Sequence, residues 1–427
     1  MEKRVMTVGK HRKGIAAVAV LLSGVLTLTA CGGDDEGGSG SGDKGKDKSS
    51  DSQSKADKAA ADEASEARIS IKPKDGSDTA SINTGGKVTV SKGKLTEVAM
   101  VAEQSGTAVE GAIAADGKSW KPAAALERAT KYEVKAVAKD SDGREAHEVS
   151  TFTTVSPENS FIGYFTPDDG KTVGVGMPVS INFDKPVSDK KAVQSAIKVN
   201  SSSGQKVVGH WFSATRLDFR PEEYWKAGSK VTVDLNLDGV DASNGVTGVQ
   251  DKKVTFNVGH AQVSTVDVKS KKMTVVRDGK TIKTIPISAG SAENPTYNGE
   301  MVISEKFKET RMDGSTVGFT DKEGKGEYDI KDVPHAMRLS TSGTFIHGNY
   351  WGSDGIFGSA NTSHGCVGLN DAKGAGDPKQ DGAWFYENSM LGDVVVVKNS
   401  PDDTIKADNG LNGWNMSWDK WQGGSAV

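Results

Sequence analysis

The sequence predicts a mainly β fold: two immunoglobulin-like β-sandwich modules, then a β-rich domain with one short helix and a Trp-rich C-terminal tail. Three observations lead to this prediction. The chain of 427 residues is too long for one hydrophobic core. Short stretches such as "KVTVS" and "YEVKAVAKD" alternate apolar and polar residues, which is the period of a half-buried strand. Asp-Gly turns at 116–117 and 142–143 separate these stretches, and helical periodicity is almost absent.

Residues 1–30 have the pattern of an export signal. Basic residues precede the apolar run "IAAVAVLLSGVLTLTA", which is short for a membrane span. A membrane anchor helix is the alternative. The run ends in "LTAC", which resembles the bacterial lipobox, where the signal is cut before the cysteine and the thiol is lipidated. We therefore expect an exported protein that is lipid-anchored through Cys31 to the outer face of the cell membrane.

Residues 31–67 are expected to form a flexible tether. From residue 32 to residue 67 the chain has no Val, Ile, Leu, Met or aromatic residue, so it cannot bury enough apolar surface to offset its ordering entropy. The net charge of the whole chain is −4, and acidic and basic residues are interspersed. This balance offers no basic field for a nucleic-acid backbone, so no nucleic-acid partner is expected. We also expect the protein to be a monomer.

Residues 68–155 and 156–260 are the two predicted sandwich modules. The second repeats the style of the first, with strand-like runs such as "PVSINFD" and "KVTVDLNL". A loose repeat also links Trp120 and "YEVKAVA" with Trp211 and "KVTVDLNL". Neither module clusters acids or histidines, so both are expected to act as spacers or positioning modules.

Residues 261–398 form the third predicted domain. A hairpin turns at Asp278-Gly279, and a second hairpin turns at Ser342-Gly343 and brings His347 to a strand end. "DPKQDGAWFYENSM" predicts a short helix, and "DVVVVKN" predicts a buried strand after it.

Residues 399–427 form the predicted tail. Trp414, Trp418 and Trp421 follow one another at spacings of four and three residues, which indicates one helical face docked on the third domain.

Cys366 is the residue that most needs explaining. The chain has 2 cysteines, and lipidation would consume the other. The remaining thiol, in "NTSHGCVGLN", is either a buried, inert side chain or a reactive nucleophile. His347 lies upstream on a predicted strand and can take the proton of the thiol, whereas His364 is too close in sequence and should shape the turn. Gly365 allows a turn whose N–H groups can hold an oxyanion, so the residues indicate cysteine acyl-transfer chemistry.

The stretch "HGNYWGSDGIFGSANTSHGCVGLN" resembles the signature of the L,D-transpeptidases: a histidine, a gap of mid-teens length, then Ser/Thr-His-Gly-Cys. The resemblance covers roughly residues 261–421 and implies a role for each matching position. Cys366 would be the nucleophile and His347 the general base. The carbonyl of Gly348 would orient His347, and the backbone around His364 and Gly365 would form the oxyanion site together with that of Cys366.

The same resemblance implies substrate-binding residues. Met312 and Tyr328 would form a lid over the substrate, Trp351 would line the cleft, and Ser342 and Gly343 would touch the donor peptide. For the first three, the alternative is ordinary core packing. For the Ser-Gly pair, the alternative is a turn with no ligand contact.

Gly368 departs from the pattern of the family. Many L,D-transpeptidases carry Asn or Arg two residues after the nucleophile, whereas this sequence has a glycine there and so lacks the side chain. Asn370 or backbone groups are expected to substitute for it.

The resemblance implies two acyl transfers on peptidoglycan stem peptides in the cell wall. Cys366 would attack the carbonyl of the third residue of a tetrapeptide stem and expel D-Ala. An amine of a second stem would then attack the thioester, giving a 3→3 crosslink. No metal or organic cofactor is implied, and carbapenems should acylate the same thiol.

Three alternatives stay open. The first is a hydrolytic L,D-carboxypeptidase acting on the same stems, and the second is a non-catalytic lipoprotein that binds the wall. The third is a zinc hydrolase using His335, His347, His364 or Cys366, although the spacings match no common ligand frame.

Overall fold

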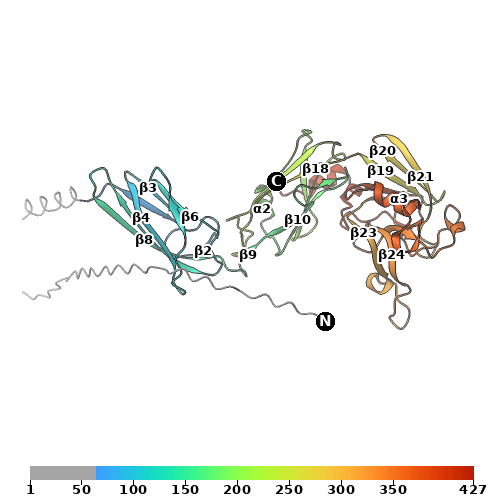
Figure 1. The fold of residues 1–427 in the computed structure, drawn as a ribbon, viewed down its shortest axis with the longest axis horizontal. Helices are drawn as coiled ribbons and strands as arrows, with labels where there is room; N and C mark the ends of the chain where they lie inside the picture. Colours follow the sequence, from blue (N-terminus) through green and yellow to red (C-terminus); the bar gives the residue numbers. More distant parts are fainter. Residues whose placement is uncertain (1–63) are drawn as a thin grey trace, which may run out of the picture. The chain divides into compact units, whose positions relative to one another are not determined.

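The computed structural model describes residues 64–427, and these residues form three successive β-rich domains, each with its own hydrophobic core (Figure 1). The mainly β fold is confirmed. The predicted signal peptide, Cys31 and most of the predicted tether lie outside the described residues. No helix between residues 64 and 427 has the length and apolarity that crossing a membrane requires.

The first domain consists of two four-stranded sheets packed face to face. The strand orders are β1-β3-β6-β5 and β2-β8-β7-β4. Alternate residues of each strand point inward, so Val88, Trp120, Val134 and Phe152 meet in the core between the sheets. The strands are β1 (Arg68–Lys72), β2 (Ser77–Ala80), β3 (Lys87–Ser91), β4 (Lys94–Ala102), β5 (Gly111–Ile113), β6 (Ser119–Pro122), β7 (Lys131–Lys139) and β8 (Glu145–Thr154).

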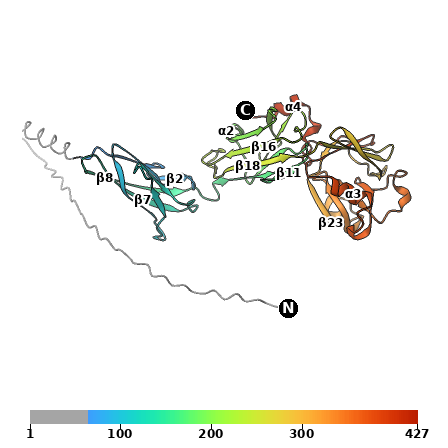
Figure 2. The same ribbon diagram turned by 45° about the horizontal axis from the view of Figure 1, so that its top comes forward.

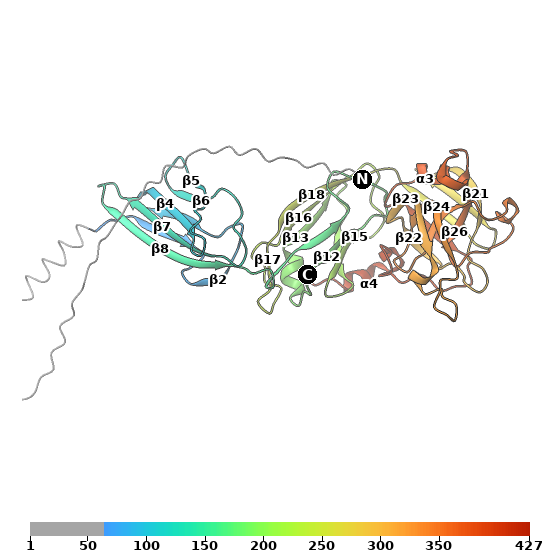
Figure 3. The same ribbon diagram turned by 60° about the horizontal axis from the view of Figure 1, so that its bottom comes forward.

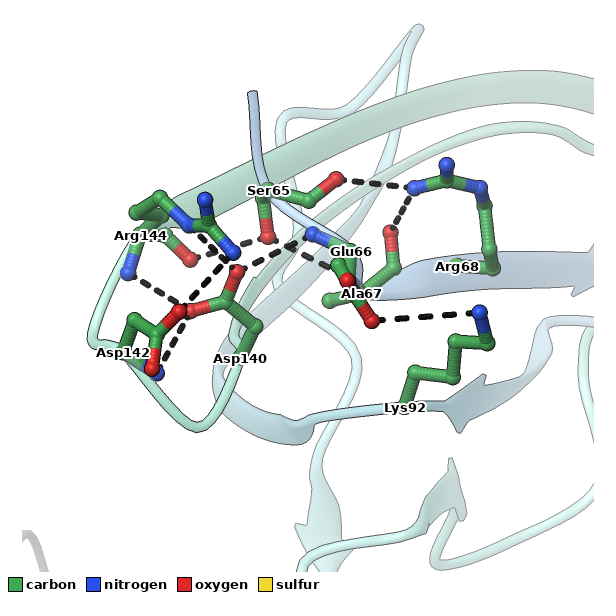
Figure 4. Close-up of polar contacts among 8 residues, drawn as sticks. All are labelled: Ser65, Glu66, Ala67, Arg68, Lys92, Asp140, Asp142 and Arg144. Carbon is green, nitrogen blue, oxygen red and sulfur yellow. Dashed lines mark hydrogen bonds and ion pairs between the residues drawn. The ribbon is translucent and has the colours of Figure 1, made fainter. Parts of the chain in front are cut away.

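The turn between β7 and β8 holds the start of the first domain in place (Figure 4). The carboxylate of Asp140 accepts hydrogen bonds from the backbone N–H groups of Glu66 and Asp142, and from the backbone and side chain of Arg144. The bond from Glu66 contributes most to holding the pKa of Asp140 at about 2. A single carboxylate thereby closes its own turn and ties it to the segment that enters β1.

The second domain is also a two-sheet sandwich, with strand orders β10-β12-β15-β14 and β11-β18-β16-β13. Figure 2 shows β16 and β18 side by side, and their pairing is antiparallel. Ile181, Leu217, Trp225 and Phe256 lie in the core. The elements are β9 (Ser160–Phe161), β10 (Gly163–Thr166), β11 (Thr172–Val173), β12 (Val179–Phe183), α2 (Lys190–Ser195), β13 (Ile197–Ser201), β14 (Val207–Trp211), β15 (Arg216–Pro221), β16 (Lys230–Asn236), β17 (Thr247–Gly248) and β18 (Asp251–Val258).

The third domain is built on a nine-stranded sheet of order β22-β27-β19-β20-β21-β26-β25-β24-β23. Figure 3 labels β21, β22, β23, β24 and β26 of this sheet. The two predicted hairpins, the short helix and the buried strand are confirmed as β20–β21, β24–β25, α3 and β27. The elements are β19 (Gln262–Asp267), β20 (Lys272–Arg277), β21 (Lys280–Ser288), β22 (Gly299–Val302), β23 (Glu305–Asp313), η1 (Gly314–Val317), β24 (Asp329–Arg338), β25 (Phe345–Asn349), η2 (Asp354–Ile356), β26 (Val367–Asn370), η3 (Lys373–Ala375), α3 (Asp381–Asn388), β27 (Val394–Lys398), η4 (Gly413–Asn415) and α4 (Trp418–Gly423).

The pairing of β25 with β26 decides where the functional residues lie. The two strands run parallel, and their register places His347 beside Gly368. Cys366 immediately precedes β26, so the histidine and the cysteine come from neighbouring strands. The connection between these strands, residues 350–366, carries the Gly-rich stretch in which Cys366 lies.

The predicted docking of the C-terminal tail is wrong in two respects. Trp414 lies in η4 and Trp418 and Trp421 in α4, so the three rings do not share one helix. They surround the guanidinium of Arg220, from β15 of the second domain, at 4.7, 5.4 and 4.4 Å from the ring centroids. A buried guanidinium attracts aromatic faces, and this position could not be seen from the spacing of the tryptophans.

The tail also contacts the third domain, but through asparagines. The Asn412 side chain accepts from the N–H of Val302 and donates to the carbonyl of Leu339. The Asn415 side chain bonds both backbone groups of Glu300. The tail therefore joins two domains: its tryptophan rings contact the second domain, and its asparagine amides contact the third.

Candidate active site

Cys366 lies immediately before β26, against a small apolar cluster. Its partners there include Val333, Ala336 and Phe345, and its Sγ lies 3.6 Å from the carbonyl oxygen of Gly343. The thiol keeps some exposure to solvent but is surrounded by protein atoms. That environment raises its pKa to about 11, because burial disfavours the thiolate.

The turn before Cys366 depends on Gly365, whose φ is +107°, a left-handed conformation that favours glycine. Ser363 fixes the turn from its other side. Its Oγ donates to the carbonyl of Cys366 at 2.6 Å and accepts from the N–H of Gly365 at 3.2 Å. Within residues 64–427, the N–H groups of His364 and Cys366 have no protein acceptor, so they are available to a ligand.

His347 is buried in β25 and held in one tautomer. Its Nδ1 lies 2.8 Å from the carbonyl oxygen of Gly348, which can only accept, so Nδ1 carries the proton and Nε2 is bare. The ring of Trp351 stacks on the imidazole, with centroids 5.6 Å apart. Burial lowers the pKa of His347, so the ring stays neutral and basic near neutral pH.

The two pKa shifts have the same consequence. A raised thiol pKa and a lowered imidazole pKa both favour the neutral pair, Cys–SH with imidazole. Both shifts therefore disfavour a preformed ion pair of thiolate and imidazolium. A bare Nε2 can still accept the thiol proton when an electrophile arrives.

His347, Cys366 and the proposed lid residues line one cleft of about 190 Å³. Met312, from β23, and Tyr328, just before β24, come from the long hairpin beside the cleft. Trp351 lines it too. The complete lining is Met312, Tyr328, Ile330, His347, Asn349, Trp351, Thr362, Ser363, His364, Cys366 and Gly368.

Ser342 and Gly343 lie apart from this cleft. They line a second cavity of about 290 Å³ together with His364 and Gly365, and His364 lines both cavities. Asn370 lines neither cavity. Asn349 lies in the first cleft and was not predicted. The signal for it was its position two residues after His347, because residues two apart in a strand share a face.

His364 packs against the segment that joins β23 to β24. Its ring lies 5.0 Å from that of Tyr328 and 5.4 Å from that of Phe319, and its Nε2 is 3.2 Å from the carboxylate of Glu327. Burial, together with the charge of Cys366 when ionised, raises the pKa of Tyr328 to about 12, so its hydroxyl remains a donor.

A buried pair of titratable residues supports the strands that carry the site. His335 Nδ1 lies 2.7 Å from Oδ2 of Asp371, which follows β26. Both side chains are almost fully buried, and a Cβ at Gly348 would collide with this carboxylate. Sequence reasoning missed Asp371 altogether. No group of three or more His, Cys, Asp or Glu among residues 64–427 is arranged to hold a metal ion.

Comparison with known proteins agrees with this architecture. Residues 77–241 match the bacterial Ig domain family, and residues 261–397 match the L,D-transpeptidase catalytic domain family. The chain is 33% identical to L,D-transpeptidase 2 of Mycobacterium tuberculosis over 352 residues, which cover 82% of this chain and 83% of that protein. The chain belongs to the L,D-transpeptidase family.

The resemblance seen in the sequence is thereby confirmed, and the protein is an L,D-transpeptidase enzyme. L,D-transpeptidase 5 of Mycobacterium tuberculosis is 32% identical, over 80% of this chain and 73% of that protein. Among solved structures, LD transpeptidase LdtMt1 in complex with imipenem is 27% identical and covers 57% of this chain and 100% of that chain, with a TM-score of 0.46.

Proposed function

We propose that this L,D-transpeptidase forms 3→3 crosslinks in peptidoglycan, with Cys366 as the nucleophile and His347 as the general base. The observation that supports these roles most is the fixed tautomer of His347. Its Nδ1 is engaged by Gly348, and its bare Nε2 belongs to a side chain lining the same cleft as the lone described thiol.

The first half of the reaction forms a thioester. Nε2 of His347 takes the thiol proton as Sγ of Cys366 attacks the carbonyl carbon of the third residue of a tetrapeptide stem. The oxygen of that carbonyl becomes an oxyanion, which the free N–H groups of Cys366 and His364 stabilise. The C–N bond to D-Ala breaks, and D-Ala leaves with the proton from His347.

The second half transfers the acyl group to a second stem. A side-chain amine of that stem attacks the thioester carbonyl and gives its proton to His347. The new amide bond forms as the C–S bond breaks, and the thiolate of Cys366 recovers the proton. Since Nε2 alternately accepts and donates one proton, no other acid or base is needed.

The side chains around the cleft would hold the donor stem. Met312 and Tyr328 form the covering lid, and Trp351 forms an apolar wall beside His347. Ser342 and Gly343 would touch the donor from the neighbouring cavity. Gly343 supports this role because its carbonyl lies against the thiol.

The experiment is product analysis on purified tetrapeptide stems by mass spectrometry. The proposal predicts crosslinked dimers from tetrapeptide stems and none from pentapeptide stems under the same conditions. Trimmed monomers without dimers would assign the protein to the hydrolytic L,D-carboxypeptidases instead. Equal use of pentapeptide donors would contradict the proposed donor.

We also propose that the enzyme works from a lipid anchor at Cys31, on the outer face of the cell membrane, and as a monomer. The "LTAC" sequence supports the anchor. Cys31→Ala should abolish lipid incorporation and move the protein out of the detergent phase on phase separation. Unchanged partitioning of that variant would contradict the anchor.

A further inference from the structure

Asn349 and Gly368 come from neighbouring strands and lie beside each other in the cleft. In the register of β25 and β26, Asn349 pairs with Asn370. Its side chain nevertheless lies beside Gly368, in the cleft that His347 and Cys366 also line. A Cβ at position 368 would lie 3.4 Å from the carbonyl oxygen of Ser288, and 3.5 Å from Nδ2 and 3.6 Å from Cβ of Asn349. These are ordinary contact distances, so a side chain longer than that of Ala would have to share the space beside the Asn349 amide.

Of the two polar groups of the Asn349 side-chain amide, the oxygen is hydrogen-bonded within the described part of the chain and the nitrogen is not. Its Oδ1 accepts the N–H of Gly352 at 2.8 Å, which identifies the oxygen and leaves Nδ2 on the other side. Nδ2 donates to no protein acceptor within residues 64–427, although the side chain is only 8% exposed. Among residues 64–427, Nδ2 is not one of the buried side-chain atoms that lack a hydrogen-bond partner, so it reaches the solvent-accessible surface, where a partner that enters the cleft can accept its hydrogen bond.

We propose that Asn349 is a substrate-binding residue, whose Nδ2 donates to a carbonyl oxygen of the donor stem peptide. A group that can only donate selects an acceptor, and the stem presents a peptide carbonyl at each residue beside the scissile bond. Gly368 is the second half of the arrangement, because its missing side chain leaves room for the amide of Asn349. This inference rests on the proposed function and names a contact of its donor site.

Two other polar side chains of the cleft already have protein partners. The hydroxyl of Ser363 is bonded to Cys366 and Gly365, and the hydroxyl of Thr362 lies 3.2 Å from that of Ser288. Asn370, the residue expected from the sequence to replace a side chain at 368, lies outside the cleft.

The test measures thioester formation by the purified protein with a tetrapeptide stem. Asn349→Ala and the isosteric Asn349→Asp both remove the donor, and each should lower kcat/KM about tenfold or more, the loss expected for one hydrogen bond in a buried site. Alkylation of Cys366 by iodoacetamide, which needs no stem contact, should stay within about twofold for Asn349→Ala. Asn388→Ala removes a comparable amide, bonded to Trp384 at the end of α3, and serves as the control.

The second part of the test moves the amide from position 349 to position 368. Gly368→Asn alone should impair the enzyme by crowding Asn349. In the double variant Asn349→Ala with Gly368→Asn, kcat/KM should recover at least half of the logarithmic loss seen in Asn349→Ala, because one amide again occupies the shared space. Unchanged stem kinetics in Asn349→Ala, or equal losses in stem and iodoacetamide reactions, would overturn the inference. A double variant worse than both single variants would overturn the pairing. Wild-type protein that forms no thioester would instead overturn the proposed function.

Discussion

Oδ2 of Asp371 and Nδ1 of His335 lie 2.7 Å apart, almost fully buried, against the backbone of Gly348. Gly348 is the residue whose carbonyl fixes the tautomer of His347. The pair therefore packs against the backbone next to the proposed general base, and neither of its residues lines the cleft. Neither residue takes part in the proposed reaction, so the pair should act through stability.

His335→Ala should destabilise the protein by about 3 kcal/mol, because it leaves a buried carboxylate without its partner. Burial already raises the pKa of Asp371 above 3.8, and loss of His335 should raise it further. The native variant would then bind more protons than the unfolded chain above about pH 4, so its stability should fall as pH rises.

Denaturant unfolding at pH 5 and pH 8 measures this effect. The deficit of His335→Ala relative to wild type should be larger at pH 8. His335→Ala with Asp371→Asn is the control, and its deficit should not grow between pH 5 and pH 8, because the carboxylate is gone. A deficit that is larger at pH 5 would contradict the argument.

Alkylation of Cys366 should increase steadily with pH. With a thiol pKa of about 11, the thiolate fraction rises about tenfold per pH unit between pH 7 and pH 9. Iodoacetamide rates in a Cys31→Ala background, where Cys366 is the one remaining thiol, check this prediction. A plateau across that range would indicate a preformed thiolate.

Because the pKa of His347 is lowered, the acidic limb of kcat/KM should lie below pH 6.5.

Arg220→Ala should release the C-terminal tail. The guanidinium contacts three tryptophan rings and donates to the carbonyl of Met416, so its loss should cost on the order of 3 kcal/mol. Limited proteolysis should cut the tail faster, and the melting temperature should fall by several degrees. Lys206→Ala, which removes an exposed contact to Gln422 of the same tail, should do neither. A tail equally protected in both variants would refute the anchoring role of Arg220.

The sequence predicted local features better than distant ones. Asp278-Gly279 ends one strand and starts the next by its own backbone preferences, and the alternation of "YEVKAVAKD" follows from one buried face. The tail was misplaced because its partner, Arg220, belongs to another domain. Asn349 was missed because its role depends on the register of two strands and on an absent side chain at 368. Asp371 was missed because only the fold brings it to His335.

Cys366 and His347 should behave as one unit. Cys366→Ala and His347→Ala should each lower kcat by about 10⁴-fold or more, and the double variant should lose little further. Cys366→Ala should change the free energy of unfolding by about 1 kcal/mol or less, because only one small atom is removed. Dimer formation and melting measured on the three variants test this. Independent, multiplying losses would argue against a shared step.

The most direct test of the account is intact-mass spectrometry of the protein mixed with a carbapenem or a tetrapeptide stem, followed by peptide mapping. The account predicts a single covalent adduct on Cys366, formed by wild type and absent in Cys366→Ala. An adduct that persists in Cys366→Ala, or that maps to another residue, would contradict it.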